Sequence, residues 1–325
     1  MQTRKLGYTD LRLTTVGFGA ASVAGGRDYG NAHRDEAESL ATVHRALDLG
    51  INWIDVAPAY GHGHGEEIVR RVVAERSERV MVATKCGRRW DEDGRPRFSL
   101  KAESLREEAE LSLRRLSVEV IDLYQIHRPR PEEELEEGWG TIVDLIREGK
   151  IRYGGASNFT LDQLKRVQAI HPVASIQPRY SMLERDIEKE LLAYCVENNI
   201  GVIPYSPMQS GLLTGKFTRA VVDALPQKDW RRGSRQFKEP AFTANLDFVE
   251  KLRPLVTRLG RPMGQLAIAW ALRRPDITAV IVGARRPSQI EESAPAGDWV
   301  LPDDVLAEIE QLLAENEEAK KRQSE

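Results

Sequence analysis

The sequence predicts a (β/α)8 TIM barrel, because eight short apolar runs alternate with amphipathic helical segments along the 325-residue chain. Several runs are apolar at nearly every position, as is typical of parallel strands that are covered on both faces. Between the second and third runs, Ile68, Val69 and Val72 fall on one helical stripe. The eight runs begin near Thr14, Asn52, Val80, Val120, Ile151, Ala174, Gly201 and Ile277.

An N-terminal β-hairpin precedes the first strand of the predicted barrel. It occupies residues 1–13, with its turn within residues 7–10, and its position suits it to closing the bottom of the barrel. A doubly wound dinucleotide-binding fold is the competing interpretation, and it requires G-x-G-x-x-G after the first strand. Gly17 and Gly19 fit that motif, but Ser22 stands in place of the third glycine, which favours the barrel.

The chain departs from a minimal barrel repeat after the seventh strand. A polar, irregular insertion spans residues 209–245. A C-terminal amphipathic helix is predicted at about residues 302–314, followed by a polar tail at residues 315–325. The sequence contains no internal repeat and no linker, so we expect residues 1–325 to form a single barrel domain.

The composition argues against several classes of partner. A net charge of −3 with interspersed signs, in a chain that is 41% hydrophobic, predicts no binding to nucleic acid or to an anionic membrane. The first residues lack the apolar core of a signal peptide, and the longest uninterrupted apolar stretch, LAIAWAL, is too short to span a membrane. Cys86 and Cys195 each lie within an apolar pattern, which favours two buried thiols and a reducing, cytoplasmic location.

Side chains that can carry acid–base chemistry follow three neighbouring predicted strands. Asp55 and Tyr60 follow the second strand, Lys85 follows the third and His127 the fourth. These side chains should meet, because the active site of a barrel gathers at the C-terminal ends of its strands. A tyrosine pKa of about 10 is too high for acid–base work at neutral pH, but a buried ammonium beside the phenol favours the ionised form. Asp55 would balance the charge of the lysine, and His127 would orient a substrate oxygen.

Seven motifs fall in order along the chain, each at its own strand end. They read NWIDVAPAYGHGHGEEIV, VMVATKCG, IDLYQIHRP, IRYGGASNF, IQPRYSMLER, IPYSPMQSGLLTGKF and VIVGARRPSQIEE. Together they resemble the aldo-keto reductase superfamily from residue 6 to about residue 292, most closely its bacterial members and its potassium-channel β-subunit branch. The resemblance implies an oxidoreductase that moves hydride between a nicotinamide and an aldehyde, ketone or corresponding alcohol. Its catalytic tetrad would be Asp55, Tyr60, Lys85 and His127.

The resemblance also implies which residues hold the cofactor. The nicotinamide would be bound by Ser157, Asn158, Gln177 and Tyr205, the last by ring stacking. The pyrophosphate would be lined by Ser206, Pro207, Gly211, Leu213 and Lys216. The adenosine part would meet Gly283, Arg285, Gln289 and Glu292.

The loop expected at the adenosine departs from the family pattern, in which a Lys-Ser pair and a later Arg are common. Gly283, Ala284 and Gln289 occupy those positions here. A preference for NADP (NADPH) therefore rests on Arg285 and Arg286, whose planar guanidinium groups suit phosphate oxygens. NAD is the open alternative.

The stretch HGHG, residues 62–65, raises the possibility of a metal-dependent barrel hydrolase. Only His62, His64 and His127 could converge, and the eighth strand ends without a carboxylate, so we predict no metal site. A third interpretation is a cofactor-sensing regulatory subunit that resembles the channel β-subunits.

The substrate pocket is the part that the sequence defines least. Its aromatic candidates are Tyr29, Trp53, Trp90 and Trp230, although Trp53 lies inside a predicted strand, where packing is the more natural role. We expect a small-molecule carbonyl or alcohol substrate. Its identity, the reaction direction and the oligomeric state are left open.

Overall fold

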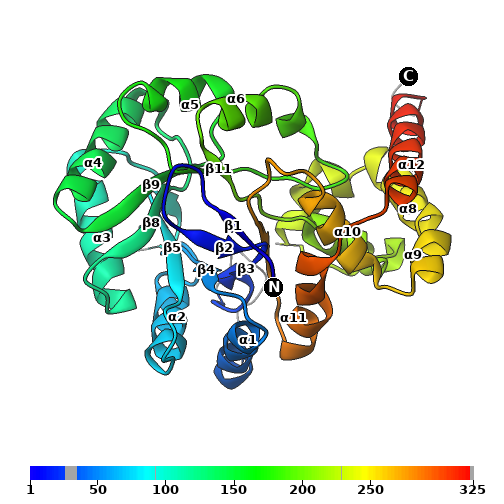
Figure 1. The fold of residues 1–325 in the computed structure, drawn as a ribbon, viewed down its shortest axis with the longest axis horizontal. Helices are drawn as coiled ribbons and strands as arrows, with labels where there is room; N and C mark the ends of the chain where they lie inside the picture. Colours follow the sequence, from blue (N-terminus) through cyan, green and yellow to red (C-terminus); the bar gives the residue numbers. More distant parts are fainter. Residues whose placement is uncertain (26–34, 92, 228, 323–325) are drawn as a thin grey trace.

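The computed structural model describes residues 1–25, 35–91, 93–227 and 229–322. Over these residues eight parallel strands form one sheet in the order β11-β10-β9-β8-β5-β4-β3-β12 (Figure 1). A parallel bridge between Tyr205 and Ile281 joins the two edge regions. The predicted barrel is therefore confirmed, with the predicted strands in the predicted order. They are β3 (Val16–Gly19), β4 (Trp53–Asp55), β5 (Met81–Cys86), β8 (Ile121–Ile126), β9 (Ile151–Ser157), β10 (Ser175–Gln177), β11 (Gly201–Val202) and β12 (Val280–Val282).

The predicted hairpin closes one end of the barrel. Strands β1 (Thr3–Lys5) and β2 (Arg12–Thr14) pair antiparallel, and in Figure 1 this dark blue hairpin lies across the barrel strands. Leu6 and Leu13 are buried in one cluster with Trp53, which lies at the N-terminal end of β4. The indole Nε1 of Trp53 donates a hydrogen bond to the carbonyl oxygen of Thr14 at 2.9 Å. Trp53 therefore belongs to the barrel interior beneath the hairpin, as its position within a strand indicates.

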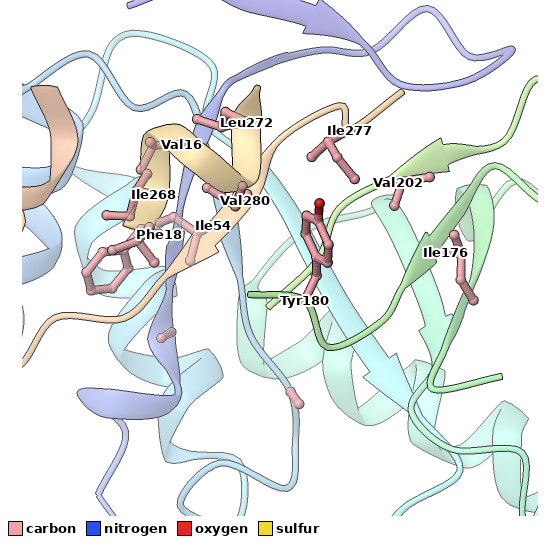
Figure 2. Packing of buried hydrophobic residues seen from close by; sticks show 14 of the residues in the cluster. Val16, Phe18, Ile54, Ile176, Tyr180, Val202, Ile268, Leu272, Ile277 and Val280 are labelled. Carbon is pink, nitrogen blue, oxygen red and sulfur yellow. The ribbon is translucent and has the colours of Figure 1, made fainter. Parts of the chain in front are cut away.

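Helices surround the sheet, and their apolar faces build the main core. Figure 2 shows Phe18 and Val280 of the sheet beside Ile268 and Leu272, which lie on a helix that is buried along its whole length. None of the helices in the described part of the chain is both long and apolar enough to cross a membrane. The helices are α1 (Glu36–Asp48), α2 (His64–Ala74), α3 (Ala102–Leu116), α4 (Leu135–Arg147), α5 (Leu161–Gln168), α6 (Leu191–Glu197), α7 (Arg219–Asp223), α8 (Ala241–Lys251), α9 (Arg253–Leu259), α10 (Met263–Leu272), α11 (Pro287–Ser293) and α12 (Asp303–Arg322).

The C-terminal helix is longer than the sequence predicts. Helix α12 continues to Arg322, so most of the predicted polar tail is helical. The added turns lack an apolar stripe but form ion pairs, between Glu315 and Lys251 at 2.6 Å and between Glu317 and Lys320 at 2.8 Å. Asn316 is only 5% exposed, because this part of α12 packs on α8. Tertiary contacts and charge pairs thus replace the missing apolar periodicity.

The insertion after β11 is also more regular than predicted. It contains a 3-10 segment (Gln209–Thr214), the short helix α7 and two further 3-10 turns, and helix α8 begins within its last residues. Thr218 caps α7, since its side chain accepts the N–H of Val221. These elements are too short to produce a helical periodicity that can be recognised in the sequence.

Candidate active site

Asp55, Lys85 and Tyr60 meet at the C-terminal end of the barrel. Asp55 ends β4 and Lys85 lies near the end of the neighbouring strand β5. The ammonium Nζ of Lys85 lies 2.7 Å from both carboxylate oxygens of Asp55, 3.1 Å from the carbonyl oxygen of Val56 and 3.4 Å from the Tyr60 hydroxyl. The lysine therefore stands between a carboxylate and a phenol, as the sequence predicts.

The Lys85 ammonium is buried, with 1% of the residue exposed. Burial lowers the pKa of Lys85, and the charge and hydrogen bonds of Asp55 oppose that shift. A second buried carboxylate also favours the ammonium: Glu66 binds the Thr84 hydroxyl at 2.7 Å and the Arg115 guanidinium at 2.7 Å. The site thus stabilises a buried cation with the contacting carboxylate of Asp55 and the negative charge of Glu66.

His127 completes the group from the end of β8. Its backbone N–H donates to the carbonyl oxygen of Cys86 at 2.9 Å, and its ring stands edge-on to the Tyr60 ring with centroids 5.9 Å apart. Burial, together with the positive charges of Lys85, Arg88 and Arg128, lowers the pKa of His127 well below its ordinary value. The imidazole is therefore neutral at neutral pH, and a neutral imidazole can donate one hydrogen bond to a carbonyl oxygen.

The residues predicted to hold a nicotinamide form one hydrogen-bonded cluster. Asn158 donates from Nδ2 to the carbonyl oxygen of His127 and to Ser157 Oγ, both at 3.0 Å, and accepts from the Tyr205 hydroxyl at 2.7 Å. Ser157 Oγ donates to the carbonyl oxygen of Gln177 at 3.1 Å. Asn158 has a φ of 62°, a left-handed conformation that asparagine tolerates better than most residues. The cluster presents amides, a hydroxyl and an aromatic ring beside His127.

The residues predicted for the phosphate and adenosine parts lie in two segments that meet, one after β11 and one that runs from the end of β12 into α11. Lys216 Nζ lies 3.2 Å from both carboxylate oxygens of Glu292, and the Gln289 side chain accepts the backbone N–H of Arg285 at 2.7 Å. Gly283 is tightly placed, because an added Cβ would lie 3.3 Å from the hydroxyl of Ser22. The structure thus brings together the segments that follow the seventh and eighth strands. Lys216, expected at the pyrophosphate, pairs here with Glu292, which is expected at the adenosine part.

The two histidines of HGHG point to different neighbours. The His62 ring stacks on Trp90 at a centroid distance of 4.7 Å, and His64, the first residue of α2, lies within 3.8 Å of the carboxylates of Glu36 and Glu67. Among the described residues, no three His, Cys, Asp or Glu side chains are grouped to hold a metal ion. His62 therefore lies in a turn, and His64 lies at the start of α2.

The aromatic residues predicted to line the substrate pocket lie in different parts of the structure. Trp90 lines a cavity of about 130 Å³ with Pro58 and Arg88, beside the loop that carries Tyr60. Trp230 begins a short 3-10 turn in the insertion, and Tyr29 lies outside the described residues.

Two features of the site escaped the sequence analysis. Gln177 donates from its side-chain amide to Asp55 at 2.8 Å, a contact between residues 122 positions apart. Glu108 on α3 accepts the backbone N–H of Gly87, just after Lys85, at 3.0 Å. The sequence does mark Glu108, because its spacing places it on the same helix face as Leu105 and Ala109, which is the buried face of α3. No local sequence pattern marks the contact between Gln177 and Asp55, because it forms across the barrel.

Comparison with known proteins places this geometry in a family. The aldo/keto reductase family model matches residues 15–314. The chain belongs to the aldo/keto reductase family. It is 35% identical to aldo-keto reductase YhdN of Bacillus subtilis, over 96% of this chain and 94% of that protein. It is also 35% identical to the NADH-specific methylglyoxal reductase of Escherichia coli, over 91% of this chain and 93% of that protein.

A solved structure agrees with the family assignment. The barrel matches the glycerol dehydrogenase AKR11B4 of Gluconobacter oxydans with a TM-score of 0.88 at 34% identity, covering 97% of this chain and 95% of that one. The predicted resemblance is confirmed by these matches. As a member of this family the protein is an oxidoreductase on a TIM barrel.

Proposed function

We propose that the protein is an NADP-dependent aldo-keto reductase in which Tyr60 is the general acid. The observation that carries the proposal is the position of the Lys85 ammonium, 2.7 Å from Asp55 and 3.4 Å from the Tyr60 hydroxyl. A cation beside a phenol stabilises the phenolate that forms when the proton leaves. The pair Asp55 and Lys85 thus prepares Tyr60 for proton transfer near neutral pH.

The proposed reaction divides the work between the cofactor and the chain. A reduced nicotinamide, when bound, supplies hydride to a carbonyl carbon. Tyr60 delivers a proton to the carbonyl oxygen, and the neutral His127 donates a hydrogen bond that orients this oxygen. In the oxidative direction Tyr60 accepts the proton from an alcohol.

The cofactor would be held by the chain's polar groups rather than by a glycine-rich turn. Ser157, Asn158 and Gln177 offer hydrogen-bonding groups for a carboxamide, and Tyr205 offers a ring for stacking. The residues proposed for the rest of the cofactor follow β11 and β12, and they combine charged, polar and apolar side chains. They are Ser206, Pro207, Gly211, Leu213 and Lys216, then Gly283, Arg285, Gln289 and Glu292. Lys216 would exchange Glu292 for a phosphate oxygen.

Initial-rate measurements test the proposal. Purified protein should oxidise NADPH when supplied with members of a panel of aldehydes, ketoaldehydes and ketones. Absence of both cofactor binding and turnover across the panel would refute it. Tight cofactor binding without turnover of any carbonyl would refute the enzymatic role and favour the regulatory-subunit interpretation.

Cofactor preference requires its own experiment, because one relative is named as NADH-specific. If Arg285 and Arg286 meet the 2′-phosphate, replacing both by alanine should weaken NADPH binding at least about tenfold and NADH binding little. Arg147→Ala is the matched control, since this exposed arginine ends α4 at the opposite end of the barrel. Equal weakening of both cofactors would show that the two arginines do not select NADP.

A further inference from the structure

Gln177 and Asp55 are joined across the interior of the barrel. In the order of the sheet, β9, β8 and β5 separate β10 from β4, so the two strands stand on opposite walls of the closed barrel. The side-chain Nε2 of Gln177 nevertheless lies 2.8 Å from Asp55 Oδ1, the oxygen that Lys85 Nζ approaches at 2.7 Å. Both Gln177 and Asp55 are 3% exposed. The carboxylate therefore has two buried donors, one from the neighbouring strand β5 and one from β10 across the barrel.

The backbone of Gln177 contacts a second set of residues. Its carbonyl oxygen accepts hydrogen bonds from Ser157 Oγ at 3.1 Å and from the backbone N–H of Asn158 at 3.2 Å. These are the residues expected to hold a carboxamide. Gln177 thus links the proposed cofactor site to Asp55, in addition to the hydrogen bond between Asn158 and the His127 carbonyl oxygen.

One ammonium serves both the carboxylate and the phenol. Lys85 Nζ has three N–H donors but four acceptor atoms within reach, namely both Asp55 oxygens, the Val56 carbonyl oxygen and the Tyr60 hydroxyl, so these acceptors compete for it. A second donor on Asp55 satisfies part of the carboxylate's demand for hydrogen bonds and weakens its hold on the ammonium. More of the positive charge of the Lys85 ammonium then acts on the Tyr60 hydroxyl.

We propose that Gln177 is a positioning residue for the acid–base group: its amide holds Asp55 and thereby keeps Lys85 within reach of the Tyr60 hydroxyl. The inference rests on the proposed function, in which Tyr60 is the general acid. It adds to the expected contact of Gln177 with a carboxamide. Loss of the amide draws the ammonium toward Asp55, so that the Tyr60 phenol ionises at higher pH.

Gln177→Met tests this role, because methionine has a similar length and no hydrogen-bond donor. Tyrosinate absorption is titrated in the protein without cofactor, and Tyr60 is isolated by subtracting the curve of the matching Tyr60→Phe variant. The Tyr60 midpoint should move to higher pH by up to about one unit in Gln177→Met. The alkaline limb of the kcat profile for carbonyl reduction should move in the same direction, because reduction needs the protonated phenol.

A matched control and a second background give the test its specificity. Gln125 is another amide buried in the barrel, 3.5 Å from Gln177 Nε2, and it makes no hydrogen bond to Asp55 among the described residues. Gln125→Met should leave the Tyr60 midpoint in place. In an Asp55→Asn background, Gln177→Met should no longer move the midpoint, since the carboxylate through which Gln177 acts has gone.

Two results would overturn the inference. One is a Gln177→Met protein that binds NADPH more weakly while its Tyr60 midpoint and kcat limb are unchanged, which would make Gln177 a cofactor ligand only. The other is a shift that persists undiminished in the Asp55→Asn background. Because the titration needs neither cofactor nor substrate, it can be read even if the parent protein reduces no carbonyl. That last finding would count against the proposed function instead.

Discussion

Glu108→Gln should stabilise the protein more at alkaline than at acid pH. Glu108 is 3% exposed, and burial raises its pKa from 4.5 to about 7. Its carboxyl oxygens accept hydrogen bonds from the backbone N–H of Gly87 at 3.0 Å and from the Ser104 hydroxyl at 3.1 Å, which oppose but do not cancel the effect of burial. A buried carboxyl with a raised pKa favours the folded state only while it is protonated.

The sign and size of the effect follow from the two pKa values. Between pH 4.5 and about 7 the folded protein keeps a proton that the unfolded chain has released, so the carboxyl's contribution is lost as pH rises through this window. The shift from 4.5 to about 7 corresponds to about 3 kcal/mol, at about 1.4 kcal/mol per unit. Glutamine keeps the shape and never ionises. The stability difference between Glu108→Gln and the parent should therefore change by about 3 kcal/mol in favour of the variant between acid and alkaline pH.

Urea unfolding at about pH 5 and about pH 8.5 measures this difference. Glu107→Gln is the control, because its carboxylate is more than half exposed and pairs with Arg89 at 2.6 Å. The difference in unfolding free energy between Glu107→Gln and the parent should vary little with pH by comparison. A Glu108→Gln difference that is the same at both pH values would refute the assignment of a raised pKa to this buried carboxyl.

Three further predictions concern the ammonium, the histidines and the core. Lys85→Met should lower kcat by at least about a hundredfold while NADPH still binds, as measured by kinetics and a binary titration; unchanged kcat would exclude the lysine from catalysis. His62→Ala and His64→Ala should change turnover by only a few-fold, and chelators should have no effect, whereas activity lost on chelation and restored by zinc would reinstate a metal site. Trp139→Ala should cost about 3–5 kcal/mol of unfolding free energy, because Trp139 is fully buried and its Nε1 donates to the His171 carbonyl oxygen at 3.1 Å. A loss below about 1 kcal/mol would contradict this packing.

The barrel and the meeting of Asp55, Lys85 and His127 at one end of it could be predicted because both leave local patterns in the sequence. Parallel strands covered on both faces appear as apolar runs, and the barrel rule places whatever follows them at one end. Asp55, Lys85 and His127 each stand at the end of such a run. Their approach to one another therefore follows from strand order, without any knowledge of side-chain conformation.

The remaining features depend on contacts between distant parts of the chain. The bond between Gln177 and Asp55 exists because β10 and β4 face each other across the closed barrel, which no local pattern records. The pairing of Lys216 with Glu292 likewise depends on how the segment after β11 meets helix α11. The sequence predicts a tail where the last turns of α12 lie, because ion pairs such as that of Lys251 with Glu315 hold these turns in place and no apolar stripe marks them.

The most direct test of the central claim is the kinetics of Tyr60→Phe, because this change removes the hydroxyl proton and keeps the ring. The account predicts that kcat for carbonyl reduction falls by about a thousandfold or more, while the dissociation constant for NADPH stays within about twofold of the parent. Circular dichroism and the melting temperature should match those of the parent. A correctly folded Tyr60→Phe protein that reduces carbonyl compounds at the parent rate would contradict the assignment of Tyr60 as the general acid.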